Sequence, residues 1–396
     1  MHQKTALILS GGGARGAYQV GVLKGLSEIF KSQKIEDPFK ILSGNSAGAI
    51  NTAYLAASNE GFANSVEKLV YLWSQLHHEN VFKTDLLSAG KFSLTSLMGF
   101  STNKNFFQFN SLLNTAPLKE LIEKNCDFKK IQTNLDQHRF DSVLITANNY
   151  NQGGAYTFIQ TPQVFDNQRL NWSNSRFKPV KTTFQSEHVM ASSSIPLLFP
   201  PIRIGDEYYG DGCVRNTSPC GPSIRLGASK LFVIGVRTLK DTPSTSKPVL
   251  QNGISLIGIL NTLLNAVLMD SVEQDVSRIQ KLNQILESVP RSTLAKNTDL
   301  KHIPVVFISP STHLTDLARE RAHKLPRILR MTISAVGELD EASEIMSYLM
   351  FETDYCKKLI EIGYEDALSA KKEIIRFFSD DKSTDSVSTN LKGESL

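Results

Sequence analysis

A serine between two glycines is the first sign of chemistry in this chain. It lies at the centre of one short turn, whose residues are Gly44, Asn45, Ser46, Ala47 and Gly48. The turn follows the apolar pair 41–42 and precedes an alanine-rich stretch, 49–57. A serine on a sharp turn between a strand and a helix exposes its hydroxyl for attack on a carbonyl carbon. The helix N-terminus behind Ser46 would stabilise negative charge there.

A second glycine-rich turn lies earlier in the chain. It follows the apolar run 6–9, and its residues are Gly11, Gly12, Gly13, Ala14, Arg15 and Gly16. Successive glycines let backbone N–H groups converge on one point, and the helix that follows favours negative charge. The turn therefore predicts an oxyanion hole, formed chiefly by the amides of Gly12 and Gly13. Arg15 is expected to hold the loop, to add positive potential, or to be an ordinary surface arginine.

The same glycines also fit a nucleotide-binding turn. Gly11, Gly13 and Gly16 match the Gly-x-Gly-x-x-Gly spacing, which is weak evidence when it stands alone. A dinucleotide site needs an acidic residue about 20 positions further on, at the end of a second strand. Glu36 and Asp37 lie near that distance, but the residues before them are not strand-like. Nucleotide binding therefore remains the weaker alternative.

The serine needs a base, and none of the eight histidines lies in a motif that indicates catalysis. A triad of Ser46, Asp211 and one of three late histidines is conceivable; these are His302, His313 and His323. A nucleophile so near the N-terminus leaves little room for the strands that precede it in α/β-hydrolases. Asp211, in an Asp-Gly pair after Tyr208 and Tyr209, is the other candidate. Such pairs most often form turns.

The composition is that of an ordinary globular protein. The chain has 396 residues, a net charge of +4, 41% hydrophobic and 21% charged residues. No dense basic stripe indicates nucleic-acid binding. The four scattered cysteines form no C-x-x-C pair, which argues against a zinc site or a disulfide scaffold and fits a reducing compartment. We expect no metal, no cofactor, no signal peptide and a cytoplasmic location.

Alternation of short apolar runs with helical periodicity predicts an α/β fold with a mostly parallel sheet. The polar, proline-containing stretch 241–248 is the best candidate boundary, and a mainly helical part follows it. One later strand, 304–308, is expected to return to the sheet. The apolar segment 254–269 is too short and too polar for a membrane span. It predicts a packed amphipathic helix, with interfacial membrane contact as the alternative.

At this point the chain resembles the patatin-like phospholipase family. Four motifs occur in the family's order: the glycine loop, the Gly-x-Ser-x-Gly turn, the segment ASSSIPLLFPP at 191–201, and an Asp-Gly motif at 211–213. Later stretches at 265–275 and 347–352 are similar to the C-terminal part of bacterial members. The resemblance implies a three-layer α/β/α fold, with a catalytic domain at 7–228 and a helical extension at 229–379. The polar composition of 380–396, rich in Ser, Asp, Thr and Lys, predicts a disordered tail.

The resemblance also implies a Ser–Asp dyad without histidine, in which Ser46 is the nucleophile and Asp211 its base. The substrate would be a lipid acyl ester, with peripheral contact at the inner face of the membrane allowed. Phospholipid, lysophospholipid, monoacylglycerol and thioester substrates all remain open. One departure is Cys213 after Gly212, where the family has glycine or alanine. We expect it to be benign unless the position needs a positive φ; a silent lipid-binding protein of this fold is the alternative.

Overall fold

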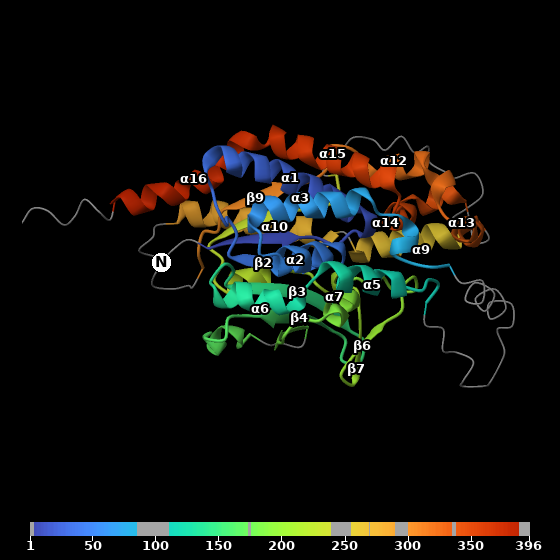
Figure 1. Ribbon diagram of the computed structural model, residues 1–396, viewed down its shortest axis with the longest axis horizontal. Helices are drawn as coiled ribbons and strands as arrows, with labels where there is room; N and C mark the ends of the chain where they lie inside the picture. The colour runs from blue at the N-terminus through green and yellow to red at the C-terminus, as the bar shows by residue number, and fades with distance from the viewer. Residues whose placement is uncertain are drawn as a thin grey trace, which may run out of the picture.

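The computed structural model describes residues 4–84, 111–172, 176–238, 255–268, 270–289, 300–334 and 338–387. Within these ranges the strands are β1 (Thr5–Leu9), β2 (Ile41–Asn45), β3 (Ser142–Asn149), β4 (Gly154–Gln160), β5 (Phe177–Lys181), β6 (Ile202–Ile204), β7 (Glu207–Gly210), β8 (Lys230–Ile234) and β9 (Val305–Ile308). They form one sheet in the order β5-β4-β3-β2-β1-β8-β9, and the β6–β7 hairpin attaches to β3 (Figure 1). Most pairs are parallel; β3 with β4, β3 with β7 and β6 with β7 are antiparallel.

The sheet is accompanied by helices along the whole chain. They are α1 (Gly16–Gln33), α2 (Ala47–Ala57), α3 (Gly61–Ser74), α5 (Ala116–Asn125), α6 (Phe128–Asp136), α7 (Ser186–Ser192), α8 (Gly221–Arg225), α9 (Leu256–Leu268), α10 (Asp270–Ser288), α12 (Leu314–Glu320), α13 (Arg327–Ser334), α14 (Ser343–Leu349), α15 (Thr353–Ser369) and α16 (Lys371–Val387). Short 3-10 turns include η1 (Gly13–Arg15), η2 (His78–Asn80) and η5 (Gly212–Val214).

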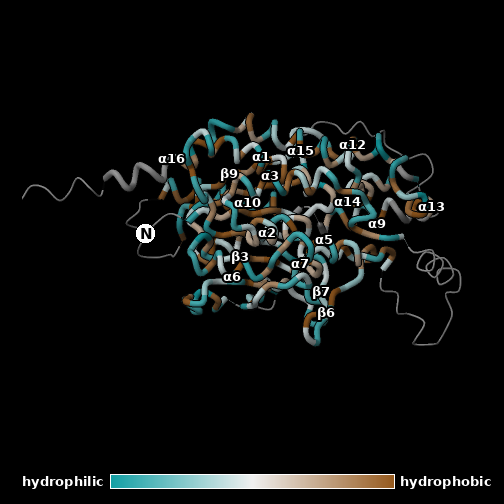
Figure 2. Tube along the Cα trace, in the orientation of Figure 1, coloured by the Kyte–Doolittle hydropathy of each residue, from teal (hydrophilic) through white to brown (hydrophobic). Residues whose placement is uncertain are grey.

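Side chains alternate across the sheet and so create two separate cores. In β1, Leu7 and Leu9 join the cluster that contains α1, α2, α3 and α15, whereas Ala6 and Ile8 join the cluster with α8 and α10. Strands buried on both faces read as continuous apolar runs, as the run 6–9 does. In Figure 2 hydrophobic, brown stretches run through the middle of the molecule. The fold is therefore the predicted three-layer α/β/α arrangement with a mostly parallel sheet.

The C-terminal part of the chain is built into this fold. Strand β9 pairs in parallel with β8, with Val233 opposite Phe307, as expected for the segment 304–308. Helix α15 lies along α1, and glycines allow their backbones to meet. A Cβ on Gly21 would lie 2.1 Å from the Ile360 carbonyl oxygen, and one on Gly363 2.2 Å from that of Tyr18. The two helices therefore pack at backbone contact.

Three further predictions concern the C-terminal tail, the boundary at 241–248 and the apolar segment 254–269. Helix α16 continues to Val387, so it includes the start of the segment predicted as a tail, and 388–396 lie outside the described residues. The proposed boundary at 241–248 also lies outside them. Helix α9 occupies most of 254–269 and buries Leu264 in the core, as the packed-helix interpretation predicts. No helix in the described ranges is both long and apolar enough to cross a membrane.

Candidate active site

Ser46 lies at the corner between β2 and α2 in a conformation that side chains rarely adopt. Its φ is 52° and its ψ is −124°, and its side chain is buried. Strain of this kind persists only where the surroundings enforce it, and it is frequent at active sites. The two flanking positions have room only for glycine. A Cβ on Gly44 would lie 2.3 Å from the Gly48 carbonyl oxygen, and a Cβ on Gly48 would lie 2.2 Å from the Leu9 carbonyl oxygen. The corner has the geometry of a nucleophile elbow.

Three consecutive serines at the end of α7 hold this corner beside Asp211. The Ser192 hydroxyl accepts a hydrogen bond from Ser46 N at 3.0 Å and donates one to the Thr146 carbonyl at 2.6 Å. The Ser193 hydroxyl donates to the Ser46 carbonyl at 3.1 Å. The Ser194 carbonyl accepts from Asp211 N at 2.9 Å. The sequence indicated these serines only as part of the resemblance, whereas the structure shows what they connect.

Asp211 is a buried carboxyl at the end of β7, only 1% exposed. Its Oδ1 accepts a hydrogen bond from Cys213 N at 2.9 Å. Burial raises the pKa of Asp211 to about 6, and the Ser46 hydroxyl and the Cys213 amide partly oppose that rise. Oδ2 has no partner within hydrogen-bonding geometry among the described residues. The effect of the Ser46 hydroxyl on the pKa of Asp211 places the two side chains near each other.

The glycine loop lies between Ser46 and the C-terminal helices. A Cβ on Gly11 would lie 2.9 Å from Ser46 Cβ, so the loop and Ser46 are adjacent. Among the described residues, the N–H groups of Gly12 and Gly13 donate to no backbone carbonyl. Gly13 has a φ of +56°, and a Cβ there would lie 2.4 Å from the Tyr348 carbonyl oxygen. Unpaired amides beside a serine are what an oxyanion hole needs.

Arg15 is buried, 3% exposed, and points from the loop into α14. Its guanidinium forms an ion pair with Glu344 and hydrogen bonds with the Ser347 hydroxyl, one at 2.9 Å. It also lies 4.8 Å from the centre of the Tyr348 ring. Burial lowers the pKa of Arg15, but the charge of Glu344, with Tyr348 and Tyr355, holds that pKa above its ordinary value. Arg15 therefore holds the loop in place, and the surface-arginine interpretation is wrong.

Replacement of Arg15 by Met is expected to destabilise the protein by about 3 kcal/mol, because it leaves Glu344 without its cation. Chemical denaturation measures this change, and Lys68→Met, which breaks an exposed pair with Glu60, is the matched control. That control should change stability by less than about 1 kcal/mol. Equal effects of the two substitutions would contradict the role assigned to Arg15.

Cys213 occupies a position that tolerates a side chain. It lies in η5, and it is absent from the described non-glycine residues with positive φ. Its backbone N–H supports Asp211, and its sulfur fills the space beside Gly11, where a Cβ on that glycine would lie 2.4 Å away. Burial raises the pKa of the Cys213 thiol well above its ordinary value, so the thiol stays neutral and unreactive. The departure from the family motif is therefore compatible with a correctly placed Asp211.

The variant Cys213→Ala is expected to keep kcat/KM within about threefold of the wild type, a change of about 0.7 kcal/mol. The backbone bond to Asp211 does not depend on the sulfur. Steady-state hydrolysis of a short-chain ester measures the effect, and Cys213→Leu is the contrast because its larger side chain must displace Gly11. A Cys213→Ala variant with less than a tenth of the activity would contradict this view.

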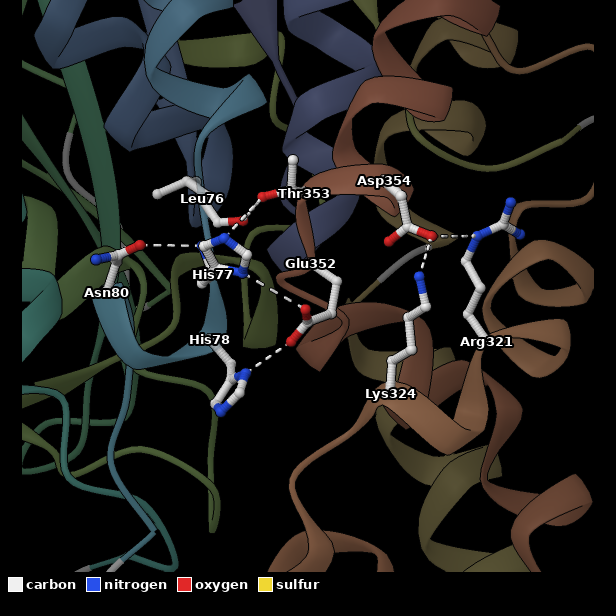
Figure 3. Close-up of polar contacts among 9 residues, drawn as sticks. All are labelled: Leu76, His77, His78, Asn80, Arg321, Lys324, Glu352, Thr353 and Asp354. Atoms are coloured by element: carbon white, nitrogen blue, oxygen red, sulfur yellow. Dashed lines mark hydrogen bonds and ion pairs between the residues drawn. The ribbon is translucent and has the colours of Figure 1, made fainter.

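Three of the described histidines make structural contacts away from Asp211. His188 is buried and accepts a hydrogen bond from Gln185 N at 3.1 Å through Nδ1. Burial lowers its pKa. His78 Nδ1 lies 2.6 Å from Glu352, and His302 pairs with Glu287 (Figure 3 shows the first of these). The pKa of Asp211 is set by burial, Ser46 and Cys213, with no histidine contribution.

The nucleotide-binding alternative lacks its acidic residue. Asp37 lies in the loop before β2, with a φ of 42°, and pairs with Arg139 at 3.5 Å. A dinucleotide site needs that residue at the carboxyl end of the second strand, where this chain has the Ser46 corner instead. Among the described residues, no group of three or more histidines, cysteines or acidic residues is arranged to hold a metal ion.

The chain matches one protein-family model and has distant likenesses to solved structures. The family model described as "Patatin-like phospholipase" matches residues 7–224. No curated protein matches the chain. Among solved structures, VipD from Legionella pneumophila has a TM-score of 0.36 at 12% identity, covering 94% of this chain and 67% of its own. The complex of SpcU with ExoU from Pseudomonas aeruginosa has a TM-score of 0.27 at 14% identity. The match covers 74% of this chain and 58% of the matched chain.

Those structural likenesses are too distant to carry an argument about function. The family match is different, because it spans more than half of the 396 residues and includes all four motifs. Its end at 224 lies just before β8, so the helices that cover Arg15 and α1 lie beyond it. By this match, the chain belongs to the patatin-like phospholipase family.

Proposed function

We propose that this protein is a serine acyl hydrolase that cleaves carboxylic ester bonds of lipids through a Ser–Asp dyad. Ser46 attacks the ester carbonyl, Asp211 accepts its proton, and the amides of Gly12 and Gly13 stabilise the oxyanion. The proton then passes to the leaving alcohol. Water attacks the acyl-enzyme, again with Asp211 as the base, and releases the fatty acid and a free Ser46.

One observation supports this proposal above the others. The backbones of Ser46 and Asp211 both bind the serine run 192–194 at the end of α7, although 165 positions separate them in the sequence numbering (211 − 46). A carboxylate is ordinarily a weak base for an alcohol. Burial makes Asp211 more basic, and the N-terminus of α2 together with unpaired loop amides would stabilise most of the charge that develops.

A fluorophosphonate probe tests the proposal directly. It should label the wild type once, and mass spectrometry of the digested protein should place the label on Ser46. Labelling at another residue, or no labelling of a protein that binds lipid vesicles, would favour the silent lipid-binding alternative. Two further measurements concern the substrate and the membrane. Comparing the hydrolysis of phospholipid vesicles with that of a soluble p-nitrophenyl ester narrows the substrate class. Sedimentation of the protein with the vesicles tests peripheral membrane contact.

A further inference from the structure

A buried hydrogen-bonded chain of three side chains connects the two helices that begin at the site. Trp73 Nε1 of α3 donates to Asn51 Oδ1 of α2 at 2.8 Å. Asn51 Nδ2 donates to Gln19 Oε1 of α1 at 3.0 Å and to the Gly16 carbonyl at 3.2 Å. Gln19 Nε2 donates to the Ser10 carbonyl at 2.7 Å. The three side chains are at most 2% exposed, so each bond is made without competition from water.

The two backbone carbonyls in this chain bracket the glycine loop. Ser10 immediately precedes Gly11, and Gly16 is the first residue of α1. Because the peptide bond is planar and trans, fixing the Ser10 carbonyl also fixes the direction of the Gly11 N–H. The loop is therefore held at both ends by amides from α1 and α2. Asn51 lies in the second turn of α2, the helix that Ser46 precedes, so the same side chain also links the loop to the Ser46 corner.

Close packing at Gly16 supports the same conclusion independently. A Cβ on Gly16 would lie 2.7 Å from Trp73 Cη2 and 2.9 Å from Ala47 Cβ. The start of α1, the start of α2 and the indole of Trp73 thus meet at one point with no room for another atom. A small change in the spacing of these three elements would move the loop amides relative to Ser46.

We propose that Asn51 and Gln19 are positioning residues that set the oxyanion loop against the nucleophile. This inference rests on the proposed function, since it assigns the network a role in that reaction. Neither side chain touches the reacting atoms. Their effect would appear in kcat rather than in KM, because misplaced loop amides weaken the transition state more than the bound substrate.

Asn134, which lies on α6 and binds the other end of α2, provides a matched control. It is 2% exposed, and its Nδ2 donates to the Ala56 carbonyl at 2.8 Å and the Ser58 carbonyl at 3.0 Å. These carbonyls lie at the C-terminal end of α2, whereas Ser46 precedes its N-terminal end. Replacing Asn134 therefore removes a buried amide of the same kind that fastens α2 away from the site.

The experiment compares Asn51→Leu and Gln19→Met with Asn134→Leu in ester hydrolysis and thermal unfolding. We expect kcat to fall about 100-fold in the first two, with KM changed by less than about threefold. Asn134→Leu should lower the melting temperature similarly and leave kcat within about threefold of the wild type. An active wild type in which Asn51→Leu and Asn134→Leu lose equal activity would overturn the inference alone.

A wild type without turnover or fluorophosphonate labelling would instead overturn the proposed function, and the inference with it. If Asn51→Leu does not fold, Trp73→Phe removes the indole N–H together with the five-membered ring and leaves Asn51 and Gln19 unchanged. We expect it to lower kcat about tenfold at unchanged KM, because Asn51 Oδ1 then loses its donor. An unchanged kcat in both Trp73→Phe and Gln19→Met would count against the role.

Discussion

Ser46→Ala is expected to lower kcat for a short-chain p-nitrophenyl ester by at least about 10⁴-fold, because the nucleophile is lost. The oxyanion loop and the substrate contacts remain, so slow hydrolysis above the uncatalysed rate is still expected. The fold should be unaffected, because Asp211 Oδ2 has no hydrogen-bond partner among the described residues that the substitution could remove. Stopped assays with purified protein and a melting curve on the same samples measure both effects.

Ser46→Gly is the control that separates catalysis from strain. Glycine adopts a φ of 52° readily, whereas alanine keeps the strain of the native residue. Both variants should be inactive, and Ser46→Gly should melt at the temperature of Ser46→Ala or above it. If either variant kept a tenth of the wild-type kcat, Ser46 would not be the nucleophile.

Much of the fold around Ser46 could be predicted because its signals are local. A buried parallel strand is a continuous apolar run, and a tight turn needs glycine, so β1, β2 and their turns are visible in the sequence. Tyr208 and Tyr209 likewise lie in β7, the strand that leads to Asp211. In contrast, β5 and β6 were not predicted. β5 is short and only partly buried, so no apolar pattern identifies it.

The contacts that hold the site could not be predicted, because they join residues far apart in the sequence. Arg15 meets Glu344 and Ser347 of α14 more than 300 positions later, and nothing near Arg15 indicates a buried partner. The amides of Gln19 and Asn51 look like ordinary polar positions in helical segments. Only the packing of α1 against α2 and α3 shows that they bond to each other and to the loop.

The ionised form of Asp211 is costly to the folded protein, and this cost gives the base a testable signature. Burial raises its pKa to about 6 from the ordinary 3.8, so folding favours the protonated carboxyl. The stabilisation that the protonated form contributes is complete below about pH 4 and is lost as the pH rises through 6. At neutral pH the ionised group therefore destabilises the fold by about 3 kcal/mol, while the proposed mechanism requires that same ionised form.

Asp211→Asn should therefore be inactive and more stable than the wild type at pH 7. The amide keeps the acceptor for Cys213 N and places a donor near the Ser46 hydroxyl, but it cannot take a proton. We expect kcat to fall at least about 10³-fold. The stability advantage over the wild type should be near zero at pH 4 and about 3 kcal/mol at pH 7.

The wild type itself should show kcat/KM rising with pH around 6, since this parameter follows ionisation of the free enzyme. Asp275→Asn is the matched control: it replaces another buried carboxyl of raised pKa, one that binds Ser218 and Cys220 N rather than Ser46. That variant should keep the acidic limb of the profile. An Asp211→Asn protein with wild-type turnover would exclude Asp211 as the base. The pKa of about 6 sets the range to examine, pH 5 to 7. If kcat/KM did not change over this range, ionisation of Asp211 would not be the cause of any fall in activity at acidic pH.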